Sequence, residues 1–314
     1  MPGVSQHLYE APPIPNFFYR NIIINGNFDI WQRGTSFISP PGATYSADRW
    51  RISQNVDNNS TVAQTTTVPN TNSQFSISIG TNALGGAGSF TALIQKIENY
   101  QLLLGKQLKL TLQAIVDPAL TGTVQVFDGT NTTLLGNLTA DNNWHFYNYQ
   151  FKLSSSATAL WVEFFVNRGG VAANHFANFS QVQLTQGVAR WEYMPPLPYD
   201  EFVRCQRYFQ RFNPNSVNQS PIGMGFTTFT NAAEIYLKMI VPLRATPVLT
   251  VVSTLTINDS TTGQAVTAIS VNAASNLQTI QFDVTVGGGG LVANRPCVLL
   301  ARTASSDLFM DAEM

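Results

Sequence analysis

Hydrophobic and polar residues alternate along several short stretches of this chain. In KQLKLTLQ, the residues Leu108, Leu110 and Leu112 fall on one face of an extended chain, and polar residues fall on the other. The same period of two recurs at 75–79, 124–126 and 280–286. This pattern predicts antiparallel strands that each bury one face and expose the other.

Sequences that favour tight turns separate these stretches. They include DPALTG from Asp117, DGTN from Asp128, NRGG from Asn167 and GGGG from Gly287. Many short strands punctuated in this way are typical of β-sandwiches and barrels, and they argue against βαβ units with a parallel sheet. The fold class predicted from the pattern is therefore all-β.

One segment has the period of a helix instead. In PYDEFVRCQRYFQRFNP, the side chains of Phe202, Cys205, Phe209 and Phe212 recur at spacings of three and four. Acidic residues stand in the first turn, a basic residue stands in the last turn, and prolines bound the segment on both sides. We predict a short connector helix at 198–212 that packs a single apolar stripe against a neighbour.

The chain is long enough for one β-domain on each side of this helix, because 314 residues exceed the usual size of a single domain. We place the first β-domain at 21–197 and the second, predicted to be a β-sandwich, at 213–314. The only cysteines, Cys205 and Cys297, then fall in different parts of the chain. We expect both to be buried free thiols and not a disulfide.

Residues 1–20 differ from both domains. Their prolines exclude a regular sheet, and their apolar residues are too few for a core. We interpret this stretch as an extended N-terminal arm, with a disordered terminus as the alternative. If the arm is an attachment peptide, its anchors are the members of its main apolar cluster, which are Ile14, Phe17, Phe18 and Tyr19.

Composition narrows the class of partner. Charged residues make up 11% of the chain, against the ~25% usual in soluble domains, and the net charge is -1 with no run of Lys or Arg. Nucleic-acid binding is not expected, because it depends on clustered positive charge. No stretch approaches the ~18 apolar residues of a membrane span, so we expect a soluble protein without membrane insertion.

Residues that carry catalysis or bind metals are few. The histidines are His7, His145 and His175, and none stands at metal-ligand spacing from another His or Cys. The sequence also lacks the motifs of phosphate-binding loops and serine hydrolases. Of the acids near the aromatic stretches, Asp29 and Asp48, the second fits a turn or an ion pair better than an acid–base pair. We expect no enzymatic activity, no metal and no cofactor.

Two stretches near the start of the first domain combine aromatic residues with arginine. NIIINGNFDIWQRG and YSADRW contribute Trp31, Arg33, Asp48 and Trp50. A catalytic loop, a glycan-binding cleft or a buried structural cluster can each have this composition. Because Trp is usually packed inside, we interpret these residues as a structural cluster in which the Asn-Gly pair turns the chain and Arg33 lies against the indoles.

A second aromatic group lies in LWVEFFVN. Alternation places Leu160, Val162 and Phe164 on one face and Trp161 and Phe165 on the other. An outward aromatic pair can bind the C–H surface of a sugar, and neighbouring amide or hydroxyl groups can bind its hydroxyls. The alternative is a second buried face covered by another sheet or subunit.

The motifs together resemble those of a group of bacteriophage virion proteins, the fibre and decoration proteins. The resemblance rests on NIIINGNFDIWQRG, YSADRW, QVQLTQGVARWEYMP, EFVRCQRYF, VPLRATPVLTV and DLFMDAEM, in that order over 21–314. It implies an N-terminal jelly roll similar to carbohydrate-binding modules, a connector helix and a second β-domain. The chain departs from the family at Thr185, where Glu is common, and at Trp191 to Tyr193, where Pro-Phe-Glu is usual.

The resemblance implies a non-enzymatic virion structural protein, assembled in the host cytoplasm with other phage virion proteins. One role is a fibre component that recognises host surface polysaccharide, and the alternative is a head fibre or capsid decoration protein that stabilises the particle. We also predict a homotrimer. In EIYLKMIVPL, Tyr236 and Ile240 oppose Ile235 and Met239, so both faces of the strand are apolar and a lone domain would expose one of them.

Overall fold

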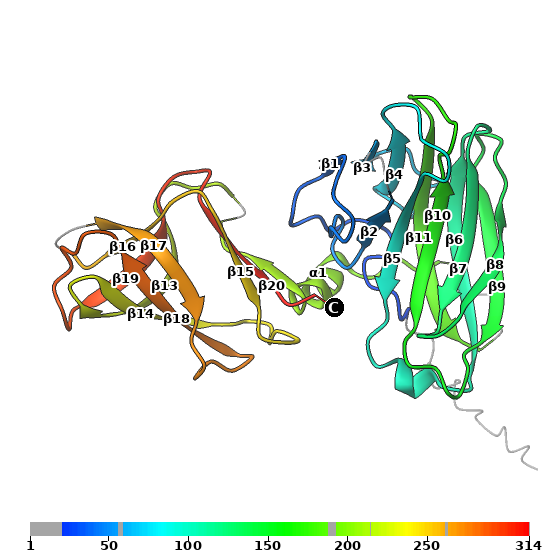
Figure 1. Cartoon of the computed structure of the whole chain (residues 1–314). Helices are drawn as coiled ribbons and strands as arrows, with labels where there is room; N and C mark the ends of the chain where they lie inside the picture. The colour runs from blue at the N-terminus through cyan, green and yellow to red at the C-terminus, as the bar shows by residue number, and fades with distance from the viewer. Residues whose placement is uncertain (1–20, 56–58, 188–192, 214, 261–262, 314) are drawn as a thin grey trace, which may run out of the picture.

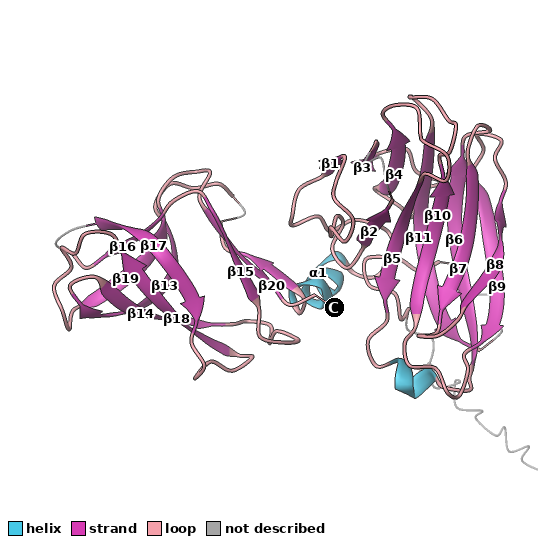
Figure 2. Cartoon of the chain, viewed as in Figure 1, coloured by secondary structure: helices cyan, strands magenta, loops and turns pink. Residues whose placement is uncertain are grey.

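The computed structural model describes residues 21–55, 59–187, 193–213, 215–260 and 263–313. The predicted arm, with Ile14, Phe17, Phe18 and Tyr19, lies outside the described residues. Figure 1 shows two β-rich parts on either side of the helix α1 (Pro198–Gln206). Figure 2 shows that strands dominate both parts, so the predicted all-β class is confirmed.

The first part is a sandwich of two antiparallel sheets, as the jelly-roll prediction required. One sheet has the spatial order β1 (Ser36–Ile38), β3 (Ser60–Thr65), β4 (Ser76–Thr81), β11 (Phe176–Gln186), β6 (Gln107–Val116) and β9 (His145–Lys152). The other has the order β2 (Arg51–Gln54), β5 (Phe90–Lys96), β10 (Trp161–Asn167), β7 (Thr121–Phe127) and β8 (Thr132–Leu138). A short 3-10 helix, η2 (Tyr100–Leu103), connects β5 to β6.

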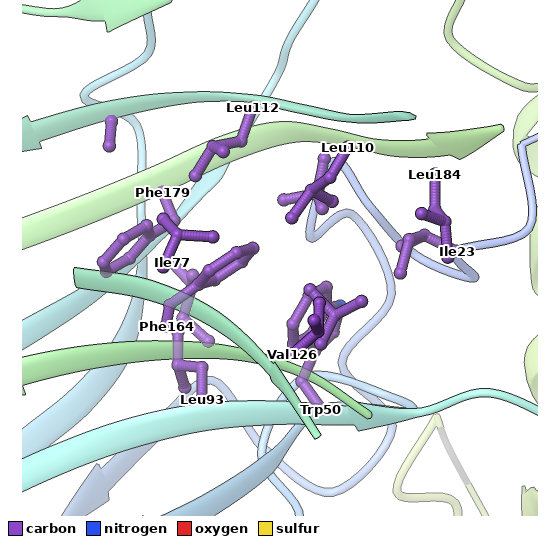
Figure 3. Close-up of a cluster of buried hydrophobic side chains, with 14 of the residues drawn as sticks. Ile23, Trp50, Ile77, Leu93, Leu110, Leu112, Val126, Phe164, Phe179 and Leu184 are labelled. Atoms are coloured by element: carbon purple, nitrogen blue, oxygen red, sulfur yellow. The ribbon is translucent and has the colours of Figure 1, made fainter. Parts of the chain in front are cut away.

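The core of the sandwich lies between the two sheets and consists of the inward half of each alternating strand. Leu108, Leu110 and Leu112 of β6 are fully buried, as their spacing predicted. Figure 3 shows Phe164 and Phe179 meeting between the sheets, and their rings stack with centroids 5.1 Å apart. Trp50 is also fully buried and packs at 5.5 Å from Phe164. Burying an aromatic side chain of this size stabilises the fold by roughly 2–3 kcal/mol.

The segment that begins at Asn21 completes the sandwich without forming a strand. It runs beside an irregularity in β11, where the pairing with β6 shifts register between Ser180 and Gln183. Val182 donates its backbone N–H to the Gly26 oxygen at 2.8 Å, and a Cβ on Gly26 would lie 2.1 Å from the Val182 oxygen. The close approach explains why glycine follows Asn25 in the predicted turn.

The connector helix is shorter than the sequence predicts. It ends at Gln206, and Phe209 belongs to the strand β12 (Phe209–Arg211) instead of the helical stripe. β12 pairs with β20 (Asp307–Asp311), which also pairs with β15 (Val248–Val252) in a three-stranded sheet. The helical period continued past Gln206 in the sequence, but strand pairing with a segment about a hundred residues away overrides it.

The second domain is a closed barrel, where the sequence predicted a sandwich. Its strands follow the order β13 (Ser220–Phe229), β14 (Ala232–Lys238), β18 (Thr279–Val286), β17 (Gly263–Val271), β16 (Leu255–Asn258) and β19 (Pro296–Ala301), which pairs again with β13. Ile235, Phe282 and Leu299 fill the interior and are fully buried. Strands with alternating apolar residues occur in sandwiches and in barrels, so the pattern could not distinguish the two folds. In the barrel, closure of the sheet leaves no strand edge unpaired.

The outside of the barrel has an apolar side and a polar side. Side chains that point outward from β14, β13 and β19 form the apolar side, which comprises Met224, Phe226, Tyr236, Pro296, Val298 and Leu300. Outward positions on β18 and β17 hold polar or small residues such as Gln281, Asp283 and Ser270. This barrel is thus amphipathic around its circumference.

Candidate functional site

Trp161 and Phe165 lie on the outer face of the sheet that contains β10. Their neighbours Val162, Phe164 and Val166 are fully buried in the core, whereas both aromatic side chains are half-buried. The structure therefore places the two predicted glycan-binding residues on one outward face. They stand four residues apart on the same strand, a separation of about 13 Å.

Each of the two residues has an aromatic partner on an adjacent strand. Trp161 stands directly opposite Phe127 of β7, and their ring centroids are 4.7 Å apart. Phe165 packs against Phe90 of β5 at the same distance. We call these four residues the aromatic strip. The sequence analysis did not name Phe127 or Phe90, because only strand register shows that they lie beside β10. The one local signal is the alternation in TVQVF, which places Phe127 outward.

A hydrogen-bonded polar pair lies between the two ends of the aromatic strip. The Gln125 side-chain amide donates to a Glu163 carboxylate oxygen at 2.8 Å, and the two residues are opposite each other in register. Burial raises the pKa of Glu163, although the hydrogen bond from Gln125 opposes the shift. The strip thus combines aromatic rings with hydrogen-bonding groups held in fixed positions.

The predicted structural cluster divides into two parts. Trp50 donates its indole N–H to the Asn25 oxygen at 2.9 Å and packs on Phe28 at 5.0 Å. Asn25 in turn donates its side-chain amide to the Ile30 and Asp48 backbone oxygens at 2.8 and 3.0 Å. Trp31 is half-buried at the edge of the cluster and stacks on Phe37. These contacts satisfy buried backbone groups, which is a structural role.

Arg33 does not lie against the indoles, which corrects the sequence prediction. Its guanidinium lies 3.7 Å above the ring of Phe209 in β12 and bonds the Asp311 carboxylate at 3.0 Å. It also lies 3.7 Å from Asp48. Arg33 therefore joins the sandwich to the strands that follow the connector, because a planar guanidinium group can stack on an aromatic ring and hydrogen-bond a carboxylate at the same time.

Asp48 is buried beneath Arg33. Its carboxylate accepts hydrogen bonds from the Gln32 backbone N–H, at 3.1 Å, and from the Gln32 side-chain amide. Burial raises the pKa of Asp48 to about 6, while Arg33 and Gln32 pull it down. Asp29, the other acid named from the sequence, hydrogen-bonds Asn27, and burial raises its pKa too. Each acid has a structural partner in the fold.

Arg49 makes a second connection that the sequence did not reveal. This fully buried guanidinium stacks 3.6 Å above Tyr208, directly after α1, and forms an ion pair with Glu313 beyond β20. It also donates to the Lys96 oxygen at 2.8 Å. Nothing in the local sequence pairs Arg49 with Glu313, since 264 positions separate them.

Other candidate reactive groups have ordinary structural surroundings. Cys205 and Cys297 are free and buried, as predicted, and burial raises the pKa of both thiols. His145 bonds Asp141 and His175 bonds Asp117, each at 2.9 Å. Within the described ranges no group of three potential metal ligands gathers, and no helix there has the length and apolarity to cross a membrane.

The apolar side of the barrel forms a second candidate surface. Met224 is 70% exposed, Phe226 44% and Tyr236 40%. A shallow hollow of about 510 Å³ lies beside them, lined by residues that include Pro296, Val298 and Leu300. An exposed apolar area of this kind marks a site of protein contact more often than a free surface.

No protein-family model and no curated protein matches this chain. Among solved structures, the enzymatically active domain of tailspike protein 4 from bacteriophage CBA120 is 16% identical over 53% of this chain and 21% of its own, with a TM-score of 0.38. TmCBM61, solved with β-1,4-galactotriose, is 15% identical over 54% of this chain and 99% of its own, with a TM-score of 0.36.

A cyclase from Fischerella sp. TAU is 15% identical over 55% of this chain and 100% of its own, with a TM-score of 0.40. This chain thus spans only about a fifth of the tailspike domain, whereas it spans the whole of the other two structures. At these identities and TM-scores none of the three indicates a function for this chain.

Proposed function

We propose that this chain is a non-enzymatic structural component of a bacteriophage virion, a trimeric fibre-type protein that recognises a glycan on the host surface. The aromatic strip is the glycan-binding face. The barrel holds the subunits together, and the protein acts in the virion after assembly in the host cytoplasm.

The observation that carries glycan recognition is the outward position of Trp161 and Phe165, with the Gln125–Glu163 pair between them. Sugar rings have one apolar C–H surface and a rim of hydroxyl groups. A flat aromatic ring beside the half-buried Gln125 amide, which Glu163 holds in place, complements both features. The strip lies on strands of the sandwich and not on loops, so its groups are held in place before a ligand arrives.

The virion role draws on the motifs of the sequence, from NIIINGNFDIWQRG to DLFMDAEM. The apolar side of the barrel supports the trimer, because three copies can bury it against one another around a threefold axis. The contacts of Asp29, Asp48 and Glu163 support a non-enzymatic protein, since each carboxylate has a hydrogen-bond or ion-pair partner that explains its position.

Binding of the purified protein to an array of bacterial surface polysaccharides tests the proposal. We expect Trp161→Ala to weaken binding about 10- to 100-fold, which corresponds to the loss of roughly 1.5–3 kcal/mol of aromatic contact. The exposed barrel residue Phe229 provides the control, and Phe229→Ala should bind as the unchanged protein does. Equal binding by both variants, with both shown to be folded by circular dichroism, would remove the strip from the proposal.

The apolar side of the barrel also favours the second candidate, a head fibre or capsid decoration protein with an assembly role. In that case the protein binds the viral capsid, and its role does not require a glycan. Binding to intact host cells, compared with binding to purified capsids that lack this protein, separates the two roles. Saturable binding to capsids alone would favour decoration.

A further inference from the structure

Two positively charged residues lie at the Trp161 end of the aromatic strip. Lys96 of β5 is directly opposite Trp161 in register, and its ammonium nitrogen lies 4.8 Å from the Trp161 ring centroid. Arg51 of β2 is opposite Ile94, two residues before Lys96 on the same face. Diagonal positions of this kind have Cα atoms about 7–8 Å apart, so both side chains can reach one ligand group.

Neither cation is neutralised within the described part of the chain. Glu98 follows β5 two residues after Lys96. It is engaged by Arg207 at 3.2 Å and Arg244 at 3.4 Å, and it also accepts from the Tyr208 hydroxyl. Glu98 therefore compensates the charges of Arg207 and Arg244. It does not serve as a carboxylate partner for Lys96 or Arg51.

Glu163 is an acid on the same outer face of the sheet, and Glu313, near Arg51, is paired with Arg49. Glu163 lies on the same face as Arg51 but two strands away across Ile94, and its side chain is buried and bonded to Gln125. Strand spacing puts the two backbones about 10 Å apart. Glu163 is therefore too far from Arg51 to pair with it, and its carboxylate is bonded to Gln125 instead of to Lys96, its diagonal neighbour on β5.

The two cations also act on each other. Lys96 and Arg51 are both half-buried, and the pKa of Lys96 is lowered, first by burial and then by Arg51, Arg49 and Arg244. A half-buried ammonium group close to other positive charges is less stable in its charged form. An anion bound between Lys96 and Arg51 would relieve this repulsion, and the Arg51 guanidinium has the planar fork that matches a carboxylate.

We propose that the glycan recognised by the aromatic strip is acidic, with a carboxylated sugar placed so that its ring lies on Trp161 and its carboxylate lies between Lys96 and Arg51. This inference rests on glycan recognition by the strip. It specifies the class of ligand as a polysaccharide that contains uronic acids or comparable carboxylated sugars, because neutral sugars leave both cations uncompensated.

The test uses the full chain and four carboxylated polymers: polygalacturonate, alginate, hyaluronate and polysialic acid. Each is paired with the same polymer after reduction of its carboxyl groups to alcohols, and neutral galactan and dextran complete the panel. We expect at least one acidic polymer to bind and its reduced form to bind about 10- to 100-fold more weakly, the range of one or two charge-assisted hydrogen bonds.

Variants assign the effect to these residues. Lys96→Met and Arg51→Met should each weaken binding of the acidic polymer about tenfold or more and leave binding of the reduced polymer unchanged. Lys152→Met is the matched control, because it removes an exposed lysine from β9 of the opposite sheet. Trp161→Ala should weaken binding of both forms.

The outcomes separate this inference from the proposed function. Equal binding of a polymer and its reduced form would overturn the inference and leave glycan recognition standing. Binding of an acidic polymer that persists in Trp161→Ala, and that falls equally in Lys152→Met, would show general ion attraction and would also overturn it. Binding to no member of the panel would contradict both the inference and the proposed function.

Discussion

Asp48 makes the stability of the fold depend on pH. It is 1% exposed, and burial raises its pKa from 3.8 to about 6 despite Arg33 and Gln32, which favour the charged form. Between these two values the folded protein holds a proton that the unfolded chain releases. The contribution of Asp48 to stability is therefore greatest below about pH 4 and is lost as the pH rises to about 6.

The direction of this change in stability with pH can be measured with Asp48→Asn, which keeps the shape of the side chain and removes its titration. The stability of the unchanged protein relative to the variant should fall by about 3 kcal/mol as the pH rises from 4 to 7, since two pKa units correspond to this energy. Urea unfolding of both proteins at several pH values gives the difference. Asp200→Asn, at an exposed position on α1, is the control.

A difference that is constant over this pH range would show that Asp48 keeps its ordinary pKa in the fold. A difference that grows in the opposite direction would mean that Arg33 and Gln32 outweigh burial.

At the level of the strands, close approach of backbones decides where glycine is required. Gly225 occupies β13 between β14 and β19, at an inward position of the barrel. A Cβ there would lie 1.7 Å from the Glu234 oxygen, which is far inside contact distance. The obstacle is backbone, so it cannot move aside as a flexible side chain would.

We predict that Gly225→Ala prevents the barrel from closing and lowers the melting temperature of the second domain by 10 °C or more, or abolishes its folding. A loss of 3 kcal/mol or more in a domain of this size corresponds to such a shift. Gly263→Ala, where the added carbon meets the Thr256 methyl group at 3.4 Å, should change the melting temperature little. Calorimetry of the two variants compares them, and equal melting temperatures would contradict the prediction.

The strands were largely predictable from the sequence, and their partners were not. Alternation located the inward faces of β6, β10 and β18 correctly, because period-two burial is a local property. The prediction that the polar face of β6 is exposed was wrong, because Lys109 and Thr111 on that face are buried as well. The helix ends at Gln206 because β20, from far along the chain, pairs with the residues that follow it. The contact of Arg33 with Asp311 depends on the same distant strand. The place of Lys96 and Arg51 at the Trp161 end of the aromatic strip could not be predicted either, since only strand register brings them there.

In the whole molecule, the amphipathic barrel is the feature that most directly suggests assembly. Its apolar side spans three neighbouring strands, and the hollow beside Met224 gives it a concave part into which a partner side chain can pack. The polar side on β17 and β18 is suited to solvent. Packing of three apolar sides around one axis would leave the polar sides outward on every subunit.

We predict a mass of three times the 34.4 kDa chain in sedimentation velocity. A double variant, Met224→Glu with Phe226→Glu, should dissociate the trimer, because each subunit would place two unpaired carboxylates in the apolar contact. Thr285→Glu on the polar side should leave the trimer intact. A stable monomer of the unchanged protein would refute the trimer, and a trimer that survives the double variant would place its interface elsewhere.

The ion pair between Arg49 and Glu313 sets an order of events during synthesis. Arg49 is translated early in the sandwich, whereas Glu313 follows the entire barrel in the sequence. At a rate of roughly 5–20 residues per second, the ribosome needs about 13 seconds or more to cover the 264 positions between them. During that interval the sandwich can fold and Arg49 can stack on Tyr208, but the ion pair forms only after the barrel strands have emerged. Premature termination just before Glu313 would then leave Arg49 stacked on Tyr208 and buried without its carboxylate partner.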